Sequence, residues 1–196
     1  MFILFFLLFT AESQILSEQE ISDLLGPFPV LGTADSQADF DELLRLQKTR
    51  TKAECEAAAK NETPTLLNLF SANDGPLTET EAKRISIELM KVYLEAGINI
   101  KTAKKHFERP RPYVIENKLK PCIKLEDSYA YPSGHATLGY MLAQILVEKY
   151  PERRETILRR AEQVAHNRVL GGVHHPSDII AAKKLAEALA NLYLAK

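Results

Sequence analysis

Two adjacent histidines near the C-terminus have the spacing of catalytic groups. They stand in the stretch NRVLGGVHHPSD, residues 167–178, of a chain with five histidines. His174 lies four residues before Asp178 and His175 lies three before it, so either imidazole can donate its Nδ1–H to that carboxylate. Such a bond fixes the tautomer and leaves Nε2 as a nucleophile or base. Pro176 disfavours helical geometry at His175, but spacing alone leaves the choice between the histidines open.

A second stretch, YPSGHATLGY, places polar groups at the start of an apolar helix. Ser133 stands at the expected N-cap, and Gly134 and His135 fall in the first turn. Free N–H groups at a helix N-terminus attract anions, and a glycine there lets an oxyanion approach the backbone. His135 is a candidate proton donor. An ordinary capped helix with a polar first turn explains the same residues equally well.

A third stretch, KKHFERPRPY, supplies fixed positive charge. Lys104 and Arg111 are seven residues apart, which places them on one side if the helix runs most of the way. Lysine offers a point charge, and arginine offers a planar fork for two oxygens of a phosphate or carboxylate. Taken alone, this stretch is more typical of a solvated basic helix end.

A metal site is a competing interpretation of the same stretches. Their histidines and aspartate are residue types that bind zinc or iron. The motifs also carry cationic side chains, among them Lys104, Arg111 and Arg168. Cations are poor neighbours for a metal ion and good neighbours for a phosphate group, so we expect neither a metal nor another cofactor.

In chain order the motifs are K-x6-R-P (104–112), P-S-G-H (132–135) and R-x5-H-x3-D (168–178). Together they resemble the type 2 phosphatidic acid phosphatase superfamily, which also contains the vanadium haloperoxidases. Within it, the chain is most similar to the class A bacterial non-specific acid phosphatases. The resemblance extends from about residue 35 to the C-terminus.

The resemblance implies a role for each motif residue. His174, with Arg168 six residues before it and Asp178 four after it, matches the family's nucleophilic histidine, which Asp178 supports. His175 matches a position that the family does not hold to histidine, and His135 matches the general acid. Five groups are implied to hold phosphate oxygens: Lys104, Arg111, Ser133, the Gly134 amide and Arg168.

The implied activity is that of an acid phosphatase. This is a metal-independent phosphomonoester hydrolase of broad specificity that acts on small molecules through a phosphohistidine intermediate. The resemblance also implies a homodimer, for which the sequence holds no independent signal. A vanadate-dependent haloperoxidase and a non-catalytic phosphate-binding helical domain stay open as alternatives.

The chain departs from the family pattern at two positions. Asn167 stands where the family has serine, and we expect altered substrate handling or rate rather than loss of activity. Pro176 also differs from related sequences, and we expect it to shift His174 slightly.

The elements that must position these residues are helices. Apolar residues recur at helical spacing in several segments, and no strand-like alternation of any length occurs. Ser36 with Asp39 predicts one helix start, and a capping box of Thr78 and Glu81 predicts another, with a helix end at Gly97. We therefore expect an all-α fold, a single compact helical bundle that comprises residues 35–196.

The N-terminal residues have a different character. Phe2 to Phe9 are apolar, too few to span a bilayer, and small residues follow them. This pattern predicts a signal peptide over residues 1–13, cleaved near Ser13, and export to the periplasm or medium. An uncleaved segment is the alternative. Residues 14–34, with Pro and Gly among apolar residues, predict an extended arm.

Charge, hydropathy and cysteine content limit the partners. A formal net charge of −1 argues against nucleic-acid binding. No apolar run is long enough to span a bilayer, so we expect no integral membrane protein. Cys55 and Cys122 form one disulfide or remain two buried thiols.

Overall fold

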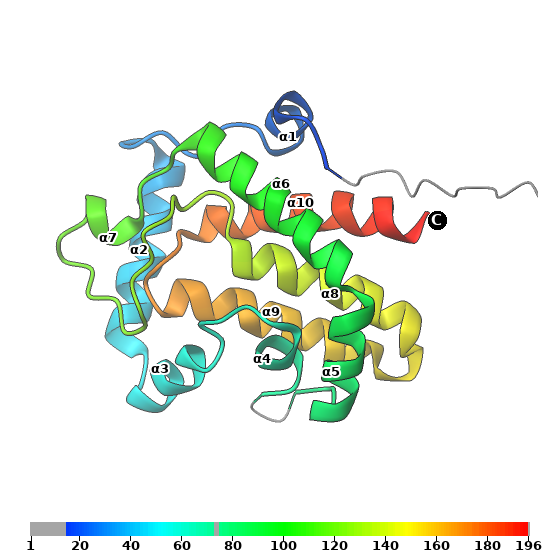
Figure 1. The fold of residues 1–196 in the computed structure, drawn as a ribbon. Helices are drawn as coiled ribbons and strands as arrows, with labels where there is room; N and C mark the ends of the chain where they lie inside the picture. The colour runs from blue at the N-terminus through cyan, green and yellow to red at the C-terminus, as the bar shows by residue number, and fades with distance from the viewer. Residues whose placement is uncertain (1–14, 73–74, 196) are drawn as a thin grey trace, which may run out of the picture.

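A computed structural model describes residues 15–72 and 75–195, and the regular structure in these ranges is helical (Figure 1). The elements are α1 (Glu18–Leu25), α2 (Ala34–Thr49), α3 (Lys52–Ala59), α4 (Leu66–Phe70), α5 (Glu79–Glu88), α6 (Met90–Phe107), α7 (Pro112–Ile115), α8 (Gly134–Lys149), the 3-10 helix η1 (Pro151–Arg153), α9 (Arg154–Leu170) and α10 (Pro176–Leu194). The described ranges contain no strand, which confirms the all-α prediction. The predicted signal peptide, residues 1–13, lies outside them.

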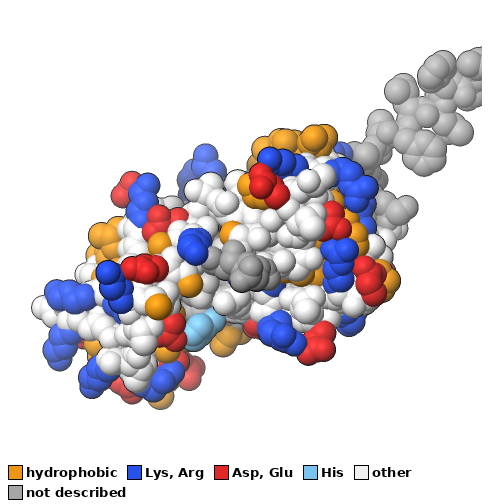
Figure 2. Space-filling view, turned by 90° about the horizontal axis from the view of Figure 1, so that it is seen from below, with side chains coloured by type: hydrophobic (Ala, Val, Ile, Leu, Met, Phe, Trp, Pro, Cys, Tyr) orange, Lys and Arg blue, Asp and Glu red, His pale blue; other side chains and the backbone are white. Residues whose placement is uncertain are grey.

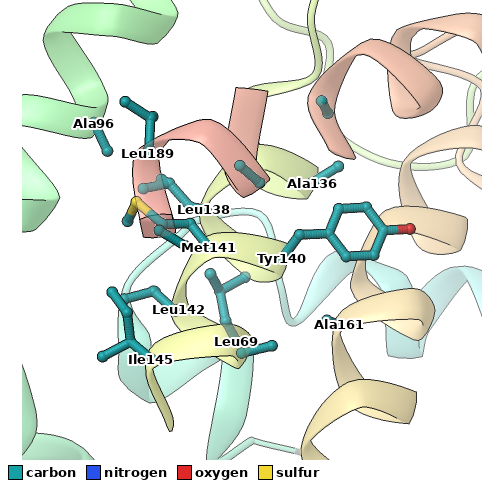
Figure 3. Packing of buried hydrophobic residues seen from close by; sticks show 14 of the residues in the cluster. Leu69, Ala96, Ala136, Leu138, Tyr140, Met141, Leu142, Ile145, Ala161 and Leu189 are labelled. Atoms are coloured by element: carbon teal, nitrogen blue, oxygen red, sulfur yellow. The ribbon is translucent and has the colours of Figure 1, made fainter. Parts of the chain in front are cut away.

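Helix α8 is the centre of the bundle. Its residues are apolar nearly all round, and it packs against α9, α10 and α6 (Figure 1). Figure 3 shows Leu138, Met141, Leu142 and Ile145 of α8 among side chains from neighbouring elements. Leu142 is 1% exposed, so its truncation to alanine costs about 2–5 kcal/mol. This packing gives the first turn of α8, which carries the P-S-G-H motif, a rigid support.

The predicted helix end at Gly97 is wrong. The capping box of Thr78 and Glu81 is present, but the break between α5 and α6 falls at Leu89, and Gly97 lies inside α6. Gly97 is exposed and a Cβ added there would meet no atom within 4 Å. The helix continues because later turns bury apolar residues such as Ile100, and it ends at Glu108 in the left-handed region (φ 49°).

Two predictions near the N-terminus also need correction. The arm of residues 14–34 is not extended throughout, because α1 forms there with a capping box of Ser17 and Glu20. Helix α2 begins one turn before the predicted cap: Thr33 is its N-cap and accepts from the Ser36 amide. Asp39 is buried and serves another purpose, described below.

The loop of residues 116–133 lies at the end of the bundle where α9 finishes and α10 begins (Figure 1). Cys55 of α3 and Cys122 of this loop form a disulfide, which decides between the two cysteine alternatives. The Cys122 amide also donates to the Gly171 carbonyl at 3.0 Å. The loop is therefore fixed to the bundle at Cys122.

The surface mixes both signs of charge. Figure 2 shows Lys and Arg interspersed with Asp and Glu on the face seen from below, in keeping with the small net charge. Across the described residues, no helix combines the length and apolar character needed to cross a membrane.

Candidate active site

The predicted site residues converge on one end of the bundle. They come from the ends of helices and adjoining segments: Lys104 (last turn of α6), Arg111 (N-cap of α7), Ser133, Gly134 and His135 (start of α8), Arg168 (last turn of α9), His174, and Asp178 (first turn of α10). Helix α6 ends at Phe107, so Lys104 and Arg111 are not on one helix and the condition for placing them on one helical side is not met. They nevertheless reach adjacent backbone carbonyls, Tyr129 O and Ser128 O respectively.

His174 is fully buried and has a defined tautomer. Its Nδ1 lies 3.0 Å from Asp178 Oδ2, and its Nε2 lies 2.8 Å from Arg111 Nη1. A guanidinium only donates, so Nε2 accepts and the ring proton is on Nδ1. Burial, followed by the charge of Arg111, lowers the pKa of His174 well below its usual value. The imidazole is therefore neutral in mildly acidic solution, with its Nε2 lone pair directed toward the cations.

Asp178 is held by three donors. Its Oδ2 also accepts from the His175 amide at 2.8 Å, and its Oδ1 accepts from Arg109 Nη1 at 2.6 Å. Burial raises the pKa of Asp178, whereas the ion pair with Arg109 opposes the rise and favours the carboxylate. Arg109 Nη2 in turn donates to Asp39 at 2.9 Å. Neither Arg109 nor Asp39 was among the predicted site residues, and Asp39 was expected only to mark a helix start.

His175 faces away from this group. Its ring packs edge-on against Phe40, with centroids 5.3 Å apart, and its Nε2 lies 3.4 Å from the Pro110 carbonyl. As predicted, it has extended geometry (φ −73°, ψ 151°) before Pro176, the first residue of α10. The geometry thus separates the two histidines, because only His174 contacts one of the predicted cations.

His135 also has a defined tautomer. Its Nε2 donates to the Glu62 carbonyl at 2.8 Å, which leaves Nδ1 as the nitrogen that can exchange a proton. Nδ1 lies 3.8 Å from Glu126 Oε1. Burial, followed by the charge of Arg168, lowers the pKa of His135 to about 4, whereas Glu126 raises it.

Arg168 is only 1% exposed and is incompletely satisfied. Its Nη2 donates to Glu126, while its Nε and Nη1 have no hydrogen-bond partner within the described part of the chain. Buried donors without acceptors are costly. Lys104, whose Nζ donates to the Tyr129 carbonyl, has its pKa lowered to about 7 by burial and by Arg111. An anion at this place would satisfy Arg168 and stabilise the charge of Lys104.

The start of α8 lies next to Asp178 and Lys104. The Ser133 amide donates to the Asp178 carbonyl at 3.1 Å, and the Ser133 side chain caps α8. A Cβ on Gly134 would lie 3.3 Å from the Ile100 side chain and 3.9 Å from that of Lys104. The first N–H groups of α8 therefore stand close to the predicted phosphate-binding lysine.

Asn167, which departs from the family pattern, lies beside rather than in this group. Its Nδ2 donates to Asn61 Oδ1 at 3.1 Å, and both side chains are buried.

Glu126, on the loop of residues 116–133, was not predicted, yet it contacts Arg111 and Arg168. Nothing in the spacing of the loop sequence marks it. The described ranges contain no cluster of three or more His, Cys, Asp or Glu side chains arranged for a metal ion.

Comparison with known proteins identifies the family of this chain. Residues 88–195, more than half of the chain, match the family model described as PAP2 superfamily. The chain belongs to this superfamily. All the site residues named in the three motifs fall within the matched segment.

The superfamily relatives include bacterial acid phosphatases. The non-specific acid phosphatase of Providencia stuartii is 32% identical over 180 residues, which cover 87% of this chain and 73% of that protein. The non-specific acid phosphatase of Salmonella typhimurium strain LT2 is 36% identical over 86 residues, 42% of this chain and 34% of that protein.

Two solved structures share the fold. A transmembrane PAP2-type phosphatidylglycerolphosphate phosphatase from Bacillus subtilis superposes with a TM-score of 0.62 at 19% identity, covering 90% of this chain and 92% of that one. A bacterial vanadium-dependent iodoperoxidase superposes with a TM-score of 0.66 at 14% identity, covering 90% and 53%.

Proposed function

We propose that this PAP2-superfamily protein is an acid phosphatase that hydrolyses small phosphomonoesters through a phosphohistidine on His174, without a metal ion. One observation carries the proposal. His174 Nδ1 donates to Asp178, and its Nε2 accepts from Arg111. The nearby Arg168 has donors without a partner in the described part of the chain. This arrangement combines a neutral nucleophile with an anion site.

In the first step, His174 Nε2 attacks phosphorus and the bond from phosphorus to the alcohol oxygen breaks. Protonated His135 delivers its Nδ1 proton to that departing oxygen. Positive charge builds on the phosphorylated imidazole, and Asp178, which accepts from Nδ1, stabilises it. In the second step, His135 takes a proton from water, the water oxygen attacks phosphorus, and the phosphorus–nitrogen bond breaks to release phosphate.

The cations supply most of the remaining catalysis. Lys104, Arg111 and Arg168 neutralise the equatorial oxygens as charge redistributes, and positioning with electrostatic stabilisation dominates phosphoryl transfer. Together these three cations have the role that a metal ion has in other phosphatases. Ser133 and the Gly134 amide, at the positive end of α8, add neutral donors.

Two further expectations belong to this proposal. Export is supported by the apolar residues 2–9 and by the Cys55–Cys122 disulfide, a bond that forms in oxidising compartments. A homodimer rests on the family resemblance alone.

The proposal is tested by hydrolysis of a chromogenic aryl phosphate between pH 4 and 8 in excess EDTA. We expect metal-independent activity with its maximum below neutrality, and its loss in His174→Ala. An inactive wild-type protein, or activity that EDTA abolishes, would argue instead for phosphate binding without catalysis or for a metal-dependent reaction.

A further inference from the structure

The carboxylate of Glu126 lies on the groups that the proposed reaction needs for phosphate. Its Oε2 accepts from Arg111 Nη2 at 2.5 Å, and its Oε1 accepts from Arg168 Nη2. Oε1 also lies 3.8 Å from His135 Nδ1, the nitrogen proposed to transfer the proton. The two oxygens of Glu126 therefore have the contacts expected of two phosphate oxygens.

The rest of the loop completes this arrangement. Arg111 Nε donates to the Ser128 carbonyl at 2.7 Å, and Lys104 Nζ donates to the Tyr129 carbonyl. Acceptors from residues 126–129 thus contact all three cations of the site. Burial opposes ionisation of Glu126, but Arg111 and Arg168 outweigh it and lower the pKa of this carboxyl to about 2. The carboxylate is therefore charged between pH 4 and 8, the range of the proposed assay.

From these contacts we infer that Glu126 is an internal competitor for the phosphate group of the substrate, and that it sets the affinity for substrate and product. This inference rests on the proposed function. A phosphate group can use Arg111 and Arg168 fully only after the carboxylate leaves them. The apparent dissociation constant is then the intrinsic one divided by the fraction of molecules in which the carboxylate has left.

The surroundings leave room for the carboxylate to move. Glu126 lies on the wall of two surface pockets, of about 390 and 330 Å³, and Arg168 lines the second. The neighbouring residues Leu125 and Asp127 are exposed. The backbone of Glu126 is held by Tyr113, whose hydroxyl donates to the Glu126 carbonyl at 2.8 Å and accepts from its amide at 3.2 Å. A rotation of the side chain alone can therefore bring the carboxylate to solvent.

The test compares Glu126→Gln with Asp127→Asn, which removes a charge from the adjacent, exposed position of the same loop. Calorimetry with inorganic phosphate gives the dissociation constant, and steady-state hydrolysis gives KM and kcat. For Glu126→Gln we expect phosphate to bind about tenfold more tightly and KM to fall by a similar factor, because the competing charge is gone. Because product leaves a tighter site more slowly, we expect kcat to be unchanged or lower. Asp127→Asn should match the wild type within about twofold.

Weaker phosphate binding and a higher KM in Glu126→Gln would overturn the inference, because Glu126 would then position the arginines for substrate. Unchanged constants would overturn it as well. If neither protein binds phosphate or hydrolyses ester, the proposed function itself fails. If both proteins hydrolyse ester but the variant binds phosphate no more tightly than the wild type, the inference about Glu126 fails and the proposed function stands.

A measurement on the unmodified protein covers the case in which the variant does not fold. The side-chain carboxyl carbon of Glu126 is followed by NMR as inorganic phosphate is added, with that of Asp127 as reference. We expect the Glu126 signal to move at the phosphate concentration that saturates the site while the Asp127 signal stays in place. A Glu126 signal that does not respond would mean that the carboxylate keeps its arginines, contrary to the inference.

Discussion

Arg109 donates to Asp178 at 2.6 Å and so connects the carboxylate that orients His174 to the remainder of the fold. The other guanidinium nitrogen binds Asp39 of α2, and all three side chains are almost completely buried. Two carboxylates share one arginine at the base of the site. The position of His174 therefore depends on a residue that does not itself face the phosphate-binding groups.

The buried ion pairs of Arg109 predict a large effect on stability. Arg109→Gln leaves Asp39 and Asp178 without their charge partner, so we expect the free energy of unfolding to fall by about 3–5 kcal/mol. Urea denaturation measures the change. Arg45→Gln is the control, because Arg45 pairs with Glu42 at the exposed surface and its loss should cost less than about 1 kcal/mol. Equal effects of the two substitutions would contradict the account of Arg109.

The lowered pKa of His135 predicts how catalysis depends on pH. With a pKa of about 4 in the unliganded protein, the protonated fraction falls as pH rises, so kcat/KM should decline from about pH 4 upward. A bound phosphate dianion brings more negative charge to Arg168 than the Glu126 carboxylate that it displaces, so it raises the pKa of His135 and should hold kcat to higher pH. Profiles of both constants test this. If kcat and kcat/KM fall over the same pH range, substrate leaves the pKa of His135 unchanged, which would contradict this prediction.

The role of His135 as proton donor predicts a dependence on the leaving group. Replacement by alanine should lower kcat/KM by about 10²–10⁴ for an alkyl phosphate, because the departing alkoxide needs a proton. A nitrophenyl phosphate, whose leaving group is stable as an anion, should lose much less. Equal losses for both substrates would assign His135 to binding rather than to proton transfer.

The disulfide between α3 and the loop of residues 116–133 predicts a stability effect of its own. The double substitution Cys55→Ser, Cys122→Ser should lower the free energy of unfolding by about 2–5 kcal/mol, because the unfolded chain loses a crosslink. A reductant should destabilise the wild type to a similar extent and leave the variant unchanged. A reductant effect on the variant would point to another cause.

Asn167 predicts a structural rather than a catalytic effect. Asn167→Ser restores the family residue but removes the buried bond to Asn61, so we expect a loss of about 1–3 kcal/mol in stability. Because the amide does not contact the phosphate-binding groups, kcat/KM should stay within about threefold of the wild type. A tenfold change in kcat/KM would instead support the expectation of altered substrate handling.

The proximity of several predicted residues could be anticipated because their signals are local, whereas their catalytic roles stay predictions. Ser133, His135, His174 and Asp178 stand in short motifs at helix starts, where a few residues determine both backbone and chemistry. The all-α fold followed in the same way from helical periodicity. The Gly97 helix end failed because an exposed glycine is tolerated inside a helix when neighbouring turns are well packed.

The residues that were missed depend on long-range contacts. Arg109 and Asp39 are 70 positions apart, and Arg168 and Glu126 are 42 apart. Neither pair has a periodicity or spacing that connects its members. A single acidic residue in a loop without regular structure gives no sign that it folds back onto two arginines, so Glu126 was visible only in three dimensions.

The central claim is that a phosphoryl group is carried by His174. It is tested most directly by quenching the reaction in alkali, where phosphohistidine survives, and locating the phosphoryl group by tandem mass spectrometry. With EDTA present throughout, the account predicts a phosphoryl group on His174 that appears and decays within turnover. A phosphoryl group on His175, or turnover without any phosphorylated histidine, would contradict it.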